Sequence, residues 1–100
     1  MGWVNDARTE LEAGRPVQVR PQGGSMRGRI ESSQLVTIAP VDPAAVKVDD
    51  VDFVKWHGNY LLHLVKEVRE GEFLIGNNIG KINGWVPAWA VVGKVIAVAE

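Results

Sequence analysis

Short runs in which apolar and polar residues alternate fill most of the chain, and turn residues separate them. This pattern is typical of β-strands that bury one face. Residues 17–20 alternate in this way and end at Pro21, which cannot donate a ladder hydrogen bond. Turn residues at 57–59 and 69–71 predict hairpins between neighbouring runs. Further strands are predicted at residues 35–39, 51–56, 60–68, 72–75 and 91–98.

A helix is predicted only near the start of the chain. Asn5 or Asp6 can cap it, and Gly14 is placed to end it after about Ala13. Residues 42–45 predict a turn or one helical turn, and the segment 76–84, rich in Asn and Gly, predicts a loop. The apolar side chains expected to dock the helix on the sheet are Val4, Ala7 and Leu11.

The order of these elements indicates the fold class. Several short strands, one short helix and no alternation of strand and helix predict a mainly β, antiparallel, partly closed barrel or coiled sheet. One hundred residues can build a single modest core but not a separate cofactor domain. Residues 1–100 are therefore expected to form one domain.

Composition excludes several classes of function. The formal net charge is −1, so the chain lacks the basic excess of a nucleic-acid-binding protein, and no nucleic-acid partner is expected. No cysteine is present, which excludes disulfides and thiolate metal sites. Two histidines without a close carboxylate cluster give little support for a metal, so no cofactor is expected.

The most apolar segment, residues 85–99, does not predict a membrane span. It is interrupted by Pro87 and Gly93 and is shorter than the ~20 residues needed to cross a bilayer. The first ten residues lack the cationic start and apolar run of a signal peptide. A soluble, cytoplasmic protein without a membrane partner is expected. Residues 91–98 are expected to form an unpaired edge, which favours a homodimer.

Two segments are candidates for chemistry. Gly23 and Gly24 precede Ser25, and paired glycines allow a tight loop to present a small hydroxyl as a nucleophile. The alternative is an ordinary turn that Ser25 caps. His63 lies within an apolar strand, where it acts either as a general base or as a buried core residue. The four tryptophans, which form part of the core or line a peptide groove, are Trp3, Trp56, Trp85 and Trp89.

The ordered set of motifs resembles a known superfamily. Gly24-Ser25-Met26 is similar to a nucleophile motif in which methionine follows the serine, and Leu62-His63-Leu64-Val65 is similar to the strand that carries the general base. Residues 35–40, 48–54, 75–78, 83–86 and 92–95 follow that family's order. Together they resemble the superfamily of signal peptidases and self-cleaving LexA-type repressors, over residues 16–98.

This resemblance implies a serine peptidase-like protein that acts on an extended peptide, on a protein substrate or on itself. Ser25 would be the nucleophile and His63 the base, a position that is lysine in bacterial signal peptidases and histidine in the endoplasmic-reticulum type. Gly24 and Met26 would contact the substrate.

The chain departs from the family at the residues that should orient the base. Asn77 and Asn83 stand where the family has aspartates. Asn83 is the first candidate to hold the imidazole, with Asn77 or Asn78 as alternatives. Replacing aspartate in a serine triad can cost ~10⁴ in turnover. Slow catalysis or none is expected, and a non-catalytic binding or assembly module with the same fold is the alternative.

Overall fold

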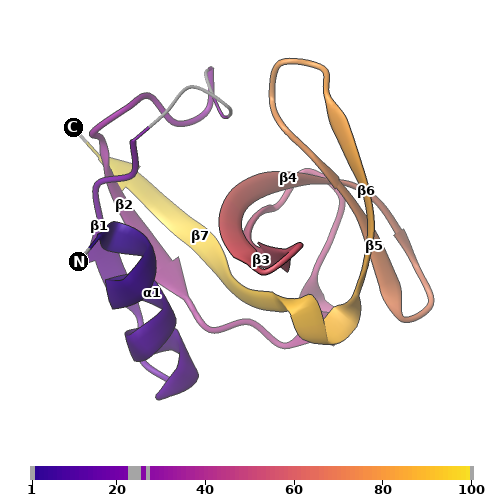
Figure 1. Ribbon diagram of the computed structural model, residues 1–100, viewed down its shortest axis with the longest axis horizontal. Coiled ribbons are helices and arrows are strands. Elements are labelled where there is room, and N and C mark those ends of the chain that lie inside the picture. Colours follow the sequence, from indigo (N-terminus) through magenta and orange to yellow (C-terminus); the bar gives the residue numbers. More distant parts are fainter. Residues whose placement is uncertain (1, 23–25, 27, 100) are drawn as a thin grey trace.

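One antiparallel sheet and an N-terminal helix make up the computed structural model, which describes residues 2–22, 26 and 28–99 (Figure 1). The helix is α1 (Trp3–Glu12). The strands are β1 (Val17–Val19), β2 (Leu35–Ala39), β3 (Val51–Trp56), β4 (Asn59–Arg69), β5 (Glu72–Gly76), β6 (Ile82–Pro87) and β7 (Val91–Ala99). Two short 3₁₀ helices, η1 (Pro43–Ala45) and η2 (Ala88–Ala90), connect strands. None of the helices in these ranges is long and apolar enough to span a membrane.

The seven strands lie in the order β1-β2-β7-β3-β4-β5-β6 and pair antiparallel. Within the described part of the chain the edge strands β1 and β6 do not pair with each other, so the sheet is not closed into a barrel. Register shifts interrupt four of its ladders, and such irregularities bend strands and increase twist. Figure 1 shows the result, in which β3 and β4 curl within the arch of the other strands. The predicted mainly β, antiparallel class with one short helix is confirmed.

Two long strands change partner halfway along. β4 pairs with β3 from Asn59 to Leu64 and with β5 from Leu64 to Arg69. Similarly, β7 pairs with β3 from Val91 to Lys94 and with β2 from Lys94 to Ala99. The interpretation of residues 91–98 as an unpaired edge is wrong for the first half of β7, which pairs with β3, whereas from Val95 on the strand pairs with β2 alone. Its apolar character reflects burial of its first half between neighbouring elements.

The coiled sheet encloses apolar side chains in two clusters. The helix-side cluster packs α1 against the sheet and is centred on Phe53, which is 0% exposed. Trp3 and Tyr60 pack on Phe53, with ring centroids 5.8 and 5.3 Å away. The hairpin-side cluster lies where β5 and β6 fold over β3 and β4, and includes Val54, Val65, Phe73, Ile75, Val86 and Ala90.

The start of α1 differs from the prediction. The helix begins at Trp3, with Gly2 as its N-cap and no side-chain capping bond, rather than at Asn5 or Asp6. The contact of Trp3 with Phe53 stabilises this first turn through tertiary packing, which outweighs a local cap. The predicted docking face is confirmed, because Ala7 and Leu11 are buried and Val4 packs against the same cluster.

Strand β6 is the element that the sequence pattern missed. The segment 76–84 was expected to be a loop, but β6 already begins at Ile82 and pairs with β5. Gly84, which favoured a turn, has a φ of +149° and lies under an indole. A Cβ on this residue would be 3.0 Å from Cη2 of Trp56. Glycine is therefore placed here for a close approach within the sheet rather than for a turn.

Candidate active site

His63 lies near the middle of β4, one residue before the strand changes partner at Leu64. Its side chain is buried, with 7% of its surface exposed. Nδ1 of the imidazole is 2.5 Å from the carbonyl oxygen of the preceding residue, Leu62. The predicted position of His63 on an apolar strand is confirmed, and the ring is held by its own backbone.

Asp52 lies directly opposite His63 in the β3–β4 register, and it also lies opposite Lys94 in the β3–β7 register. Residues that face each other across antiparallel strands project their side chains to the same side of the sheet. A row of ionisable side chains therefore crosses three adjacent strands. Asp52 stands at its centre and is 0% exposed.

The surroundings of Asp52 disfavour its charge. Burial, with a smaller contribution from the nearby Asp50 carboxylate, raises the pKa of Asp52 to about 7, while Lys94 opposes this shift. Neither carboxylate oxygen has a hydrogen-bond partner among the described residues. The Lys94 ammonium is instead 3.2 Å from Oδ1 of Asp50. Asp52 consequently changes its charge near neutral pH inside the protein, which is typical of functional carboxyl groups.

The predicted nucleophile Ser25 and the neighbouring Gly24 lie outside the described residues, so the pairing of Ser25 with His63 and the substrate contact of Gly24 remain predictions. Met26 and Ile30, further along the same loop, are buried in the helix-side cluster together with Leu62. The carbonyl of Met26 accepts the backbone N–H groups of the residues at positions 29 and 30. Met26 thus anchors the loop, and its predicted contact with a substrate is not tested by this packing.

Two further contacts locate Gly28 and Arg29 relative to the sheet. A Cβ on Gly28 would be 2.9 Å from Nδ2 of Asn78, which lies in the turn after β5. The Arg29 guanidinium donates to the carbonyl oxygen of Asp49 at 2.9 Å, just before β3. The described part of the loop therefore touches one segment that leads into β3 and another that follows β5.

The candidate asparagines are not placed as the orienting member of a catalytic triad would be. Asn83 lies on β6, and β5 separates this strand from β4, which carries His63. Neighbouring strands in a sheet are ~4.8 Å apart, so two such spacings separate β6 from β4. The buried Oδ1 of Asn83 has no partner among the described residues. Oδ1 of Asn77 accepts the backbone N–H groups of Ile79 and Lys81, at 3.0 and 2.8 Å. Asn77 therefore shapes the turn between β5 and β6, and neither asparagine is on a strand shown to pair with His63.

Asp52 is the residue of this site that the sequence analysis missed. A signal was available, because a single carboxylate interrupts the apolar run from Val51 to Val54. Such a residue is costly to bury unless it is paired or has a role. Only the ladder shows that it faces His63 rather than solvent.

No group of three or more His, Asp or Glu side chains among the described residues is arranged to hold a metal ion. No protein family, curated protein or solved structure was found to match the chain.

Proposed function

We propose that this protein is a serine peptidase-like domain of the signal peptidase and LexA type, which acts on an extended peptide or on itself. Ser25 is the nucleophile and His63 the general base. The observation that carries the proposal is the buried carboxylate of Asp52 directly opposite His63. A carboxylate that orients a histidine base is the arrangement found in Ser-His-Asp triads. The sequence resemblance supplies the identity of the nucleophile.

Asp52 takes the orienting role for which the asparagines were first considered. An imidazole that accepts a proton becomes cationic, and a neighbouring carboxylate stabilises that charge. In the present geometry Nδ1 of His63 contacts the carbonyl of Leu62. For Asp52 to orient the base, the imidazole ring has to rotate so that one N–H points to Asp52. Binding of a substrate along β4 would trigger this rotation. Slow turnover is expected because neither carboxylate oxygen of Asp52 has a hydrogen-bond partner among the described residues.

Labelling with a serine-reactive fluorophosphonate tests this proposal. The wild type should be labelled at Ser25, whereas Ser25→Ala and His63→Ala should not, because the hydroxyl needs its base to attack. His57→Ala is the matched control, since His57 is exposed in the turn between β3 and β4. Equal labelling of the wild type and His63→Ala would show that His63 is a core residue and not the general base. Absence of label in the wild type would refute the proposed hydrolase.

The alternative, a non-catalytic assembly module, is favoured by the second half of β7. From Val95 to Ala99 this half has only β2 as a partner among the described strands. Its free side borders a hollow of about 300 Å³ that is also lined by Asp49 and Val51. Ile96 is 59% exposed there. A strand from a second copy would find unpaired backbone groups at this place.

Sedimentation distinguishes this alternative. A homodimer that pairs through residues 95–99 should dissociate in the variant Ile96→Lys, because the lysine would place a charge in the interface between the two copies. Ile79→Lys, at an equally exposed apolar position in the β5–β6 turn, should leave the dimer intact. A monomeric wild type at high protein concentration would refute self-association.

A further inference from the structure

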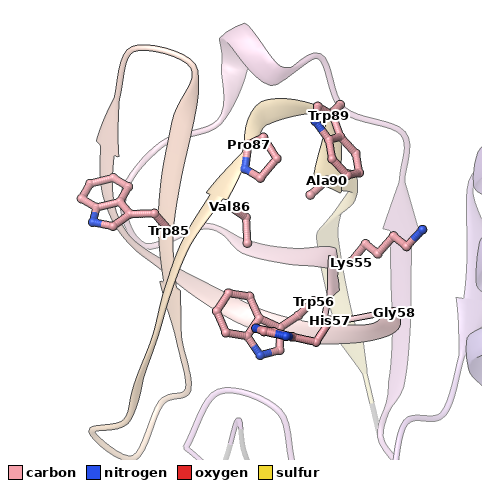
Figure 2. Close-up of a pocket in the computed structure, with 9 residues that line it drawn as sticks. All are labelled: Lys55, Trp56, His57, Gly58, Trp85, Val86, Pro87, Trp89 and Ala90. Atoms are coloured by element: carbon pink, nitrogen blue, oxygen red, sulfur yellow. The ribbon is translucent and has the colours of Figure 1, made fainter.

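A hollow lined by aromatic side chains lies on the hairpin side of the molecule, formed by residues of β3, the turn after it, β6 and η2 (Figure 2). Its volume is about 250 Å³. None of its residues belongs to the candidate active site. The side chains that matter are Trp56, Trp89, Val86, Ala90, Lys55 and His57.

One wall of the hollow is held in place. The Trp56 indole packs edge-on against the His57 ring, with centroids 4.4 Å apart. The far end of the indole lies against Gly84, where a Cβ would be only 3.0 Å from Cη2. Contacts on two sides fix the ring before any ligand arrives, and a preformed wall reduces the entropy cost of binding.

The opposite rim is formed by Trp89 on the short helix η2. Its side chain is 73% exposed, which forfeits most of the stabilisation that burial of an indole brings. Figure 2 shows its ring across the hollow from Trp56, with Val86 and Ala90 between the two. Val86 and Ala90 are 3% and 2% exposed and provide an apolar floor. A flat apolar group bound here would lie on that floor, between the two indoles.

The only fixed charge among the described lining residues is the ammonium of Lys55. It makes no ion pair with any residue that the structure describes. Glu12, which lines an adjacent hollow beside Lys55, is paired with Arg8 at 3.5 Å. An unpaired cation at the rim of an aromatic site selects ligands with a negative group.

Trp85 does not add a third stacking surface. Figure 2 shows its indole directed away from Trp56 and Trp89. The guanidinium of Arg69 lies 3.8 Å from the centroid of that ring and covers one face. The ligand-facing surface of the hollow is therefore made by Trp56 and Trp89.

We propose that this hollow binds a small aromatic carboxylate, with the ring between Trp56 and Trp89 and the carboxylate on Lys55. The volume of about 250 Å³ is slightly below that of typical drug-sized pockets, so it suits one or two fused rings. This binding is independent of the serine and histidine chemistry proposed above.

Calorimetric titration with indole-3-acetate tests the proposal, and indole-3-acetamide is the uncharged match. We expect saturable binding of the acid, and about threefold to fivefold weaker binding of the amide, because an exposed ion pair contributes modestly. Lys55→Gln should weaken binding of the acid by the same factor and leave that of the amide unchanged. Trp89→Ala should weaken both by about tenfold, since one stacking partner is lost.

Matched controls are Lys47→Gln and Ile79→Ala, both at exposed positions away from the hollow. Circular dichroism should show that all variants fold, because the substituted side chains are exposed. Equal affinity for the acid and the amide would overturn the role of Lys55. Unchanged affinity in Trp89→Ala, or no saturable binding at millimolar concentration, would overturn the site itself. Tighter binding of the peptide Gly-Gly-Trp than of indole-3-acetate would overturn the small-molecule ligand and indicate that the hollow binds a peptide carboxyl terminus.

Discussion

Asp52 on β3 and His63 on β4 lie opposite each other at the point where the sheet passes from one half to the other. Next to this pair, β4 changes partner at Leu64 and β7 changes partner at Lys94. The two side chains are 0% and 7% exposed. A titratable pair is therefore built into the most constrained part of the fold, and its charge state is coupled to stability.

The free energy of unfolding should fall as pH rises through the titration range of Asp52. Burial raises its pKa from the ordinary value of 3.8 to about 7, so between these values the folded state binds the proton more tightly than the unfolded chain. Stability from this group is therefore fully present below about pH 4 and is lost as pH rises through about 7. The loss amounts to as much as about 4 kcal/mol.

Asp52→Asn removes this dependence, because an amide stays neutral. Urea denaturation from pH 4 to pH 8 should show that the variant gains stability relative to the wild type as pH rises. The charged or titratable groups that face Asp52, namely His63, Asp50 and Lys94, are present in both proteins. Asp6→Asn on the exposed face of α1 serves as control. Parallel stability curves for the wild type and Asp52→Asn would contradict the prediction.

Substitutions of the two charged neighbours should move the pKa of Asp52 in opposite directions. Asp50→Asn removes a like charge and should lower it, and Lys94→Met removes an opposite charge and should raise it. Carboxyl carbon chemical shifts followed by NMR against pH measure the change directly. Asp49→Asn, whose side chain is 73% exposed, should have little effect. Shifts of the same sign in the two neighbour variants would show that these charges do not act on Asp52.

Gly93→Ala should destabilise the protein by about 1 to 3 kcal/mol through overpacking. A Cβ at this position would be 2.9 Å from the Ala39 carbonyl oxygen, 2.9 Å from Cγ2 of Ile38 and 3.0 Å from Cδ1 of Leu11. One of these atoms is backbone and the others belong to buried side chains, so none can move away freely. Thermal unfolding measures the loss, with Gly2→Ala as control, since nothing lies within 4 Å of a Cβ there. An unchanged melting temperature in Gly93→Ala would contradict the prediction and show that β2 and α1 can move away from the added methyl group.

Much of the secondary structure was predictable because its signals are local. The runs at residues 35–39 and 51–56 have the bounds of β2 and β3, since alternation and flanking Pro or Gly act over a few residues. The burial of Ala7 and Leu11 follows from their spacing on α1. By contrast, β6 was missed because Gly84 indicates a turn until Trp56 is placed over it.

The candidate site was predictable only in part. The sequence located His63 on an apolar strand, but it did not identify Asp52, whose importance depends on the β3–β4 register. Asn83 was a candidate partner of His63 because it stands where the resembled family has an aspartate, whereas β5 separates their strands. Ser25 and Gly24 lie outside the described residues, and their roles remain predictions.

The amino-acid sequence by itself determined the β class, the docking face of the helix and most strand limits, because periodicity and turn chemistry depend on neighbouring residues. Only the tertiary structure decided which strands pair. It placed β7 between β2 and β3, with a free side only along its second half, and it brought Asp52 opposite both His63 and Lys94. The physical reason is that strand partners are selected by packing between distant segments, so the same alternating pattern is compatible with several strand orders.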